Sequence, residues 1–346
     1  MKTENRIVLS IAASLLAGFL SGCGNGGPQV SPDGIEEPHS LTFAMDWLAV
    51  PAQAGFYQAL GSGGYREAGL DITIEEATSS SQYPTSRVAA GQIELCVAES
   101  TRLLQAVAKG IPLVAIFCHN SSMPTCLVVH KDGPIRSFAD LDGKRLLVTP
   151  GVPWIDYLKQ RYEIDFRVSA RPPSLAQFMR DTSLEAVQQV YATNQLQILE
   201  EAGVPHRPLM LTDAGYDPMR LVVARKEWAD ANPEIIEAFA RASMQGYHDY
   251  FFKDPRPGNA ELQTRNPLLS DQRIEYHNKR VMEGPWIFPD AASGVPFGWV
   301  PPERLAQDRD LLIEIGLLEP DSLPPIEELI YSPELLKGFA WDGQPR

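Results

Sequence analysis

The sequence predicts an α/β fold with mostly parallel sheets. Short apolar runs of alternating pattern are followed repeatedly by amphipathic helical segments, and this order is typical of βαβ units. Apolar residues make up 44% and charged residues 21% of the chain, as in globular proteins with a large core. At ~100–200 residues per domain, the chain beyond residue 40 is long enough for two lobes or one large domain.

The first part of this body shows the clearest alternation. Its most regular apolar run is LDITIEE at 70–76, where every second residue is apolar. We expect strands at 41–47, 70–76, 93–98 and 113–118. We expect helices between them at 53–60, 83–90 and 101–109.

A second group of elements begins near residue 126. We expect strands at 126–131, 145–149, 185–191, 209–212 and 220–224, and helices after Ser137 and at 153–162. The segment 185–191 fits a helix equally well, because Gln188 and Gln189 suit either state. From Pro233 onward the chain is largely helical, with Pro/Gly-rich surface connections at 255–258 and 284–302.

The N-terminus carries an export signal. Lys2 and Arg6 precede an apolar run at 7–20, which ends in Leu-Ser-Gly directly before Cys23. This pattern predicts a signal peptide over 1–22, and its end resembles a bacterial lipobox, in which the cysteine is lipidated. The alternative is an ordinary signal peptide followed by a chance cysteine. Residues 23–40 then form the lipidated cysteine and a flexible tether, and the protein is extracytoplasmic, on the periplasmic or cell-surface side.

The net charge of −14 limits the class of partner. An acidic chain argues against nucleic acid and against binding anionic lipid by charge alone. Beyond the N-terminal signal, no run of 18 apolar residues occurs in the sequence. We therefore expect membrane attachment through the lipid anchor only.

Seven segments in order and spacing resemble one protein family. They are 45–47 (MDW), 55–59 (GFYQA), 64–71 (GYREAGLD), 88–94 (VAAGQIE), 109–115 (KGIPLVA), 191–195 (YATNQ) and 232–239 (NPEIIEAF). Over nearly all of residues 40–335, the chain resembles the periplasmic solute-binding proteins of the sulfonate, nitrate and thiamine-pyrimidine group, which serve ABC importers.

The resemblance implies a type II-like periplasmic binding protein with two α/β lobes. Lobe 1 would comprise 41–120 plus 220–346 and lobe 2 would comprise 121–219, joined by two crossing strands near 118–126 and 215–220. The ligand would lie between the lobes, where the carboxyl ends of the strands meet. We expect a monomer that binds a small molecule, needs no cofactor and delivers its ligand to an ABC permease.

Asp46 and Trp47 are the first ligand-binding candidates. A carboxylate can accept hydrogen bonds from ring amino groups, and an indole can stack on a flat heterocycle. The pair resembles the thiamine-pyrimidine branch, although Gln53 stands where that branch often has histidine. Asn194 and Gln195 match a cleft-facing Asn-Glu pair of the family, with Gln in place of the acid. The alternative is that Trp47 packs in the core and Asp46 caps a helix.

Helix starts supply further candidates. Hydroxyls and exposed amides at such positions can hold an anion or a carbonyl oxygen, and they can equally serve as plain caps. The candidates are Ser79, Ser80, Ser81, Ser100, Thr101, Gly151 and Trp154, the last as a second stacking wall. Tyr57 and Tyr216 are weaker candidates, which we expect to pack rather than to contact ligand.

The remaining cysteines indicate no metal site. Cys96 lies in an apolar strand, where a buried thiol acts as a small hydrophobe. A disulfide between Cys118 and Cys126 stays open, because both flank a short loop in an oxidising compartment. His119 and His130 lie nearby, but the spacing lacks a Cys-x2-4-Cys element, so we expect no metal.

An enzyme is the rival class, because the family includes a thiamine-pyrimidine synthase. That enzyme uses a lysine for pyridoxal phosphate, a histidine and a cysteine-rich motif. Here Ala98 stands at the lysine position, Arg102 at the histidine position, and 217–221 (DPMRL) contains no cysteine. Schiff-base chemistry needs an amine, so we expect no enzymatic activity.

Taken together, these observations predict a solute receptor. A thiamine-pyrimidine precursor is the first choice of ligand, and a sulfonate, taurine or nitrate anion is the second. A signalling or scaffold lipoprotein that keeps the fold without transport is a third possibility.

Overall fold

A computed structural model describes residues 37–77, 83–172, 174–288 and 296–331, and Pro38–Arg346 form one compact unit. The predicted signal peptide, Cys23 and tether therefore lie outside the described residues, as do Ser79, Ser80 and Ser81. Within the described ranges, no helix is long and apolar enough to cross a membrane.

The first sheet contains strands from both ends of the unit. In the described part of the chain its order is β2-β1-β3-β10-β4. The strands are β1 (His39–Ala44), β2 (Leu70–Glu75), β3 (Leu95–Glu99), β4 (Leu113–Asn120) and β10 (Arg220–Arg225). β1 is parallel to β2 and β3, whereas β10 is antiparallel to both of its neighbours.

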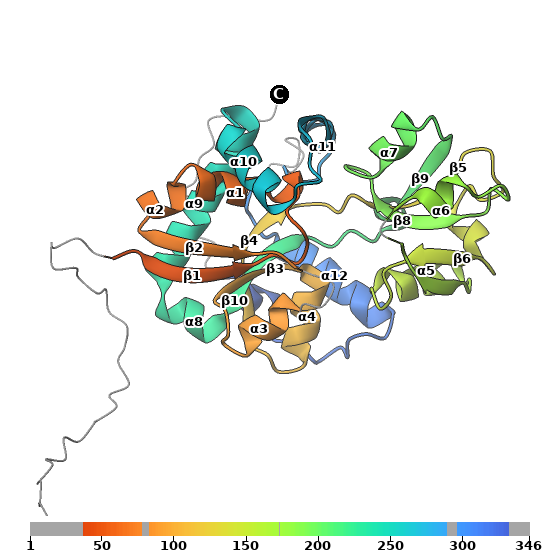
Figure 1. Cartoon of the computed structure of the whole chain (residues 1–346). Helices are drawn as coiled ribbons and strands as arrows, with labels where there is room; N and C mark the ends of the chain where they lie inside the picture. Colours follow the sequence, from red (N-terminus) through yellow and green to blue (C-terminus); the bar gives the residue numbers. More distant parts are fainter. Residues whose placement is uncertain (1–36, 78–82, 173, 289–295, 332–346) are drawn as a thin grey trace, which may run out of the picture. The chain divides into compact units, whose positions relative to one another are not determined.

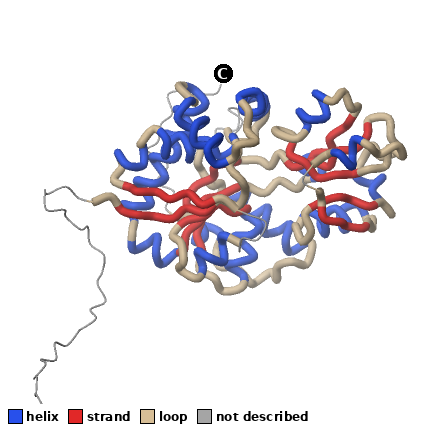
Figure 2. Tube along the Cα trace, in the orientation of Figure 1, coloured by secondary structure: helices blue, strands red, loops and turns tan. Residues whose placement is uncertain are grey.

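Helices cover both faces of this sheet (Figures 1 and 2). One core cluster joins β1 and β2 to the helices of one face, and a second joins β3 and β4 to those of the other. On the first face lie α1 (Ala54–Gly61), α2 (Gly64–Glu67), α9 (Pro233–Phe252), α10 (Arg256–Arg265) and α11 (Asp271–Glu283). On the second face lie α3 (Pro84–Ala89), α4 (Ser100–Ala108) and α12 (Pro302–Glu314), while α8 (Lys226–Ala231) connects β10 to α9.

Two glycines explain how closely α1 and α9 approach each other. A Cβ on Gly55 would lie 2.1 Å from the ring of Tyr247, and one on Gly246 would lie 2.1 Å from the carbonyl oxygen of Gly55. Only glycine leaves room for backbone at such a crossing. This contact fixes Tyr247, which reaches the functional site described below.

The second sheet has the order β7-β6-β8-β5-β9 in the described residues. Its strands are β5 (Thr125–His130), β6 (Arg145–Val148), β7 (Arg167–Ala170), β8 (Val187–Tyr191) and β9 (His206–Met210). Helix α5 (Trp154–Tyr162) packs on one face, and α6 (Ala176–Met179) and α7 (Leu196–Glu201) pack on the other. The short 3-10 helices are η1 (Pro51–Gln53), η2 (Phe138–Leu141), η3 (Leu211–Ala214) and η5 (Ile326–Leu329).

In each sheet, the strand that follows a connection from the other sheet is antiparallel to both of its neighbours. These strands are β5 and β10. The chain leaves the first sheet after β4, passes through 121–124 and enters the second as β5, which is antiparallel to β8 and β9. It returns through 215–219 into β10. The α/β class predicted from the sequence is confirmed, and the sheets are mixed because of these two reversed strands.

Each expected strand overlaps a strand of the structure, several with shifted ends, and one strand was missed. The segment 185–191 is a strand over Val187–Tyr191, although its glutamines suited either state. No strand was expected at Arg167–Ala170, because this edge strand is half exposed and lacks apolar alternation. The strand expected at 209–212 begins earlier, at His206, and ends at Met210.

The three cysteines within the described residues are free thiols, and all are buried. The disulfide left open between Cys118 and Cys126 is therefore not formed. Burial holds the pKa of each thiol above its ordinary value, so these thiols stay protonated and unreactive.

Candidate functional site

A pocket lies where strand ends from both sheets meet. The carboxyl ends of β1, β4 and β8 contribute to it, as expected for a ligand site of α/β sheets. Its lining residues are Trp47, Val50, Ala52, Gln53, His119, Asn120, Pro124, Tyr191, Thr193, Asn194, Arg220 and His277.

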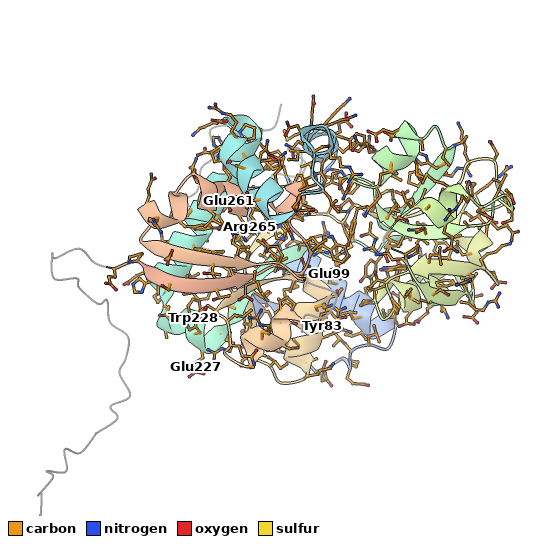
Figure 3. All side chains as sticks on the ribbon, in the orientation of Figure 1. Tyr83, Glu99, Glu227, Trp228, Glu261 and Arg265 are labelled. Atoms are coloured by element: carbon orange, nitrogen blue, oxygen red, sulfur yellow. The ribbon has the colours of Figure 1, made fainter. Side chains whose placement is uncertain are left out.

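One buried guanidinium group organises the charges beside this pocket. Arg220, at the start of β10, forms an ion pair with Asp46 and a second, at 3.5 Å, with Glu99. Glu99 ends β3 and is labelled in Figure 3. Burial lowers the pKa of Arg220 to about 10 and raises the pKa of Glu99 above its ordinary value. Two of the guanidinium nitrogens of Arg220, Nη1 and Nη2, are therefore directed to protein carboxylates.

The tautomer of His119 follows from its neighbours. The hydroxyl of Tyr247 donates to the carbonyl oxygen of Ala52 at 3.1 Å, and the same hydroxyl lies 3.1 Å from His119 Nδ1. Because a phenol has one proton to donate, we infer that His119 Nδ1 carries a hydrogen and donates it to Tyr247. Burial lowers the pKa of His119 to about 3, so the ring is neutral and Nε2 is a bare acceptor.

The pocket holds unsatisfied hydrogen-bonding capacity. Among the described residues, five buried polar atoms in or directly beside it have no protein partner: Asp46 Oδ1, Gln53 Oε1, His119 Nε2, Asn120 Oδ1 and His277 Nδ1. Burial also lowers the pKa of His277 to about 3 and keeps it neutral. Buried polar atoms without partners are costly, which indicates a site that a ligand completes.

Aromatic side chains form one wall of the pocket. The rings of Trp47 and Tyr191 meet edge to face, with centroids 6.4 Å apart. The guanidinium carbon of Arg171 lies 5.1 Å from the centroid of the Trp47 ring. Trp47 is 37% exposed, so it is free of the core and able to move.

The free space in the pocket is small, about 50 Å³. A volume of this size holds a few water molecules. A six-membered ring therefore enters only if the wall moves. Trp47 is the most exposed of the lining residues, so we expect its side chain to be the part of the wall that moves.

The predicted site residues divide into two groups. Trp47, Gln53 and Asn194 line the pocket, and Asp46 lies beside it through Arg220. Gln195 stands next to Asn194, but its side-chain oxygen accepts the backbone N–H of Tyr191 at 2.8 Å.

The other candidates with described side chains do not line this pocket. Trp154 was expected to be a stacking wall, but it is 3% exposed within the core under the second sheet. Tyr216 packs beside Tyr157 in the same core, and Tyr57 donates to Glu76 Oε1 at 3.0 Å. Tyr216 and Tyr57 thus pack, as expected for these weaker candidates, and all three side chains point to the packed side of their elements.

The helix-start candidates of α4 and α5 make no pocket contact either. Ser100 Oγ donates to Asp308 Oδ2 at 2.5 Å and accepts the backbone N–H of Met219 at 3.0 Å. Thr101 is fully buried in the first turn of α4. Gly151 is exposed, with a φ of 73° that favours glycine in the turn before α5.

Several pocket residues were missed by sequence reasoning. His119 was weighed only as a metal ligand, yet its position beside Asn120 at the end of β4 was a usable signal. Arg220 had a weaker signal, because it lies at the start of β10, the strand that follows the second connection between the sheets. His277 had no such signal in the sequence, because α11 lies beside the pocket only as a result of tertiary packing. In the described ranges, no group of three or more His, Cys, Asp or Glu side chains is arranged to hold a metal ion.

The chain matches one family model and is similar in sequence to several known proteins. A family model described as NMT1/THI5 like matches residues 50–257. A Haemophilus influenzae protein named for thiamine biosynthesis is 25% identical over 200 residues, which cover 55% of this chain but only 63% of that relative. The 4-amino-5-hydroxymethyl-2-methylpyrimidine phosphate synthase THI11 of Saccharomyces cerevisiae is 23% identical over 250 residues, covering 67% of this chain and 72% of the enzyme.

Solved structures show the same fold. The periplasmic aliphatic sulphonate binding protein from Escherichia coli aligns with a TM-score of 0.63 and 17% identity, over 89% of this chain and 96% of that one. The periplasmic nitrate-binding protein from Synechocystis PCC 6803 aligns with a TM-score of 0.58 and 16% identity, over 87% and 88%. The two-lobed periplasmic binding protein fold expected from the sequence is confirmed.

Proposed function

This chain belongs to the NMT1/THI5-like family, and we propose that it is the solute-binding component of an ABC importer rather than an enzyme. Its ligand is held in the pocket between Trp47, His119 and Asn194. Closure of the two sheet-bearing halves around the ligand then presents a shape that a permease recognises.

The observation that carries this proposal is the set of unsatisfied acceptors in the pocket. Asp46 Oδ1, Gln53 Oε1 and His119 Nε2 are buried and accept no hydrogen bond from a described residue. A ligand that completes them supplies N–H or O–H donors. A flat heterocycle with an amino group meets this need and can stack on Trp47, so a thiamine-pyrimidine precursor remains the first choice. One relative named for thiamine biosynthesis and another named as an aminopyrimidine phosphate synthase support this choice.

A sulfonate, taurine or nitrate ligand is the second candidate. The sulphonate- and nitrate-binding neighbours in fold favour it, as does the presence of Arg220 in the pocket lining. A sulfonate or nitrate group, however, offers only acceptors. A nitrate or a simple alkanesulfonate would leave the acceptors of the pocket unsatisfied, whereas taurine could supply donors from its ammonium group. Each of these anions would need Arg220 to release Asp46.

A synthase is disfavoured by the residues present. Ala98 is 3% exposed within β3 and offers no amine, and no lysine or cysteine is among the described residues that line the pocket. Schiff-base formation with pyridoxal phosphate requires an amine at the site. A lysine-dependent absorbance band on addition of pyridoxal phosphate would overturn this part of the proposal.

The ligand test uses residues 24–346, which contain the whole compact unit Pro38–Arg346. We expect 4-aminopyrimidines with a hydroxymethyl or aminomethyl arm to raise the melting temperature and to bind in calorimetry. The same rings without the amino group serve as matched controls and should bind more weakly. Binding of alkanesulfonates without binding of any aminopyrimidine would reverse the order of the two candidates.

A further inference from the structure

A second and larger hollow lies on the second sheet, away from the pocket described above. It has a volume of about 620 Å³ and is bounded by β6, β7 and the segment 177–187. Among its lining residues are Lys144, Arg145, Leu147, Arg167 and Arg180, and none of its lining residues lines the first pocket. We call it the arginine groove.

Two arginines stand side by side in this groove. In the parallel register of β6 and β7, Arg145 is the partner of Arg167, so both project from the same face of the sheet. Like charges on neighbouring positions of adjacent strands destabilise a sheet. Arg145 Nε donates to the neutral hydroxyl of Ser169 at 2.8 Å, and no carboxylate among the described residues pairs with either guanidinium.

The acidic residues of the groove are already engaged. Glu185 pairs with Lys144 at 2.9 Å. Asp181 accepts the hydroxyl of Ser183 at 2.6 Å and the backbone N–H of Ala186 at 2.7 Å, so its oxygens turn toward its own loop. The groove therefore keeps three guanidinium groups, including that of Arg180, without a carboxylate partner in the described chain.

This excess of cations is unlike the rest of the molecule. The chain carries a net charge of −14, whereas the groove gathers Lys144, Arg145, Arg167 and Arg180 against Asp181 and Glu185. Leu147, which is 5% exposed, projects from the same face of β6 as Arg145 and gives the groove an apolar floor. A volume of this size lies within the range of small-molecule sites.

We propose that the arginine groove binds a phosphate-bearing ligand. Guanidinium groups match the geometry of phosphate oxygens and bind them through paired hydrogen bonds. The phosphate lies between Arg145 and Arg167, Arg180 approaches from the residue that follows α6, and an apolar part of the ligand rests on Leu147. The phosphate belongs to a free phosphate ester or to a phospholipid headgroup, and the experiment below distinguishes the two.

The first arm of the test measures binding of inorganic pyrophosphate to residues 24–346 by calorimetry at low and high salt. We expect binding that weakens as salt rises. The double variant R145Q/R167Q should lose it by at least tenfold in affinity. The matched control R161Q/R207Q removes the same charge from α5 and β9 and should bind like the wild type, as should W47A, because Trp47 lies in the other pocket.

The second arm measures capture of the same proteins by phosphatidylglycerol vesicles. Capture that R145Q/R167Q loses and R161Q/R207Q keeps assigns the phosphate to a lipid headgroup. Pyrophosphate binding without vesicle capture assigns it to a free ligand. Equal behaviour of the two double variants in both arms, or no binding by the wild type in either, overturns the proposal. Since W47A and ligand screening test the first pocket separately, failure here leaves the proposed function intact.

Discussion

At the scale of single residues, Trp47 gives the most direct test of the pocket. Its ring meets Tyr191 and Arg171 and is 37% exposed. Trp47→Ala should weaken a stacked ligand by ~1–3 kcal/mol in calorimetry, in line with stacking on other aromatic platforms. The melting temperature should change little, because the side chain lies outside the core. Leu48→Ala removes a neighbouring exposed side chain and should bind normally; equal affinities for both variants would remove Trp47 from the site.

Asp308 makes the stability of the fold depend on pH. The pKa of this carboxyl is raised from 3.8 to about 7, chiefly by burial and to a smaller extent by Asp217 and Glu99, while the hydrogen bond from Ser100 and the charge of Arg304 act in the opposite direction. Since the folded-state pKa lies above the unfolded one, the folded protein holds more protons between these values. The contribution of Asp308 to stability is therefore full below about pH 4 and is lost as pH rises toward 7.

Asp308→Asn removes this titration while the amide oxygen can still accept from Ser100. We expect the free energy of unfolding, measured in urea, to fall less steeply between about pH 4 and 7 than in the wild type. Asp310→Asn, on the exposed side of the same helix, should keep the wild-type slope. A wild-type slope in Asp308→Asn would show that another group titrates.

At the scale of elements, Asp217 joins the two connections between the sheets, 121–124 and 215–219, through hydrogen bonds. Its carboxylate accepts the backbone N–H of Met123 at 2.7 Å and the hydroxyl of Ser122 at 2.9 Å, both in the first connection. Arg304 of α12 donates to the carbonyl oxygen of Asp217 at 2.7 Å and pairs with its carboxylate at 3.2 Å. Asp217 thus holds the two connections together at one point.

Asp217→Ala should loosen this fastening. We expect a loss of ~1.5–3 kcal/mol in the free energy of unfolding, typical of hydrogen bonds to a charged group. We also expect a broader distribution of lobe separations in solution scattering, since Ser122 and Arg304 lose their shared partner. Asp213→Ala, an exposed residue of η3, is the control and should change neither. Unchanged stability in Asp217→Ala would contradict a fastening role.

The elements also show where sequence reasoning succeeds and where it stops. Strands such as β2 were predictable because Leu70, Ile72 and Ile74 alternate toward the core. The edge strand β7 was not predictable, because neither face of Arg167–Ala170 is buried and the segment therefore has no apolar alternation. Of the pocket residues, Trp47 was predictable from its place at the end of a strand, and Asn194 from the family resemblance. His277 was not, because its place depends on how α11 packs against η1.

At the scale of the whole molecule, family and fold were predictable for a reason that does not extend to the ligand. The order and spacing of segments spread over the chain define the fold, and each segment adds to the signal. The ligand depends instead on a few atoms such as His119 Nε2, whose state is decided by Tyr247 and Ala52, far away in sequence. The inward pairing of Arg220 with Asp46 likewise joins residues 174 positions apart.

Cys23 lies outside the described residues, and its predicted lipidation is tested on the intact protein. Cys23→Ser should abolish labelling by radioactive palmitate and move the protein from the membrane fraction to the supernatant. Among the described residues, no helix is long and apolar enough to cross a membrane. Ligand affinity should stay at the wild-type value, because the pocket lies within the separate compact unit Pro38–Arg346. Membrane retention and labelling of Cys23→Ser would instead mean that attachment comes from another part of the chain.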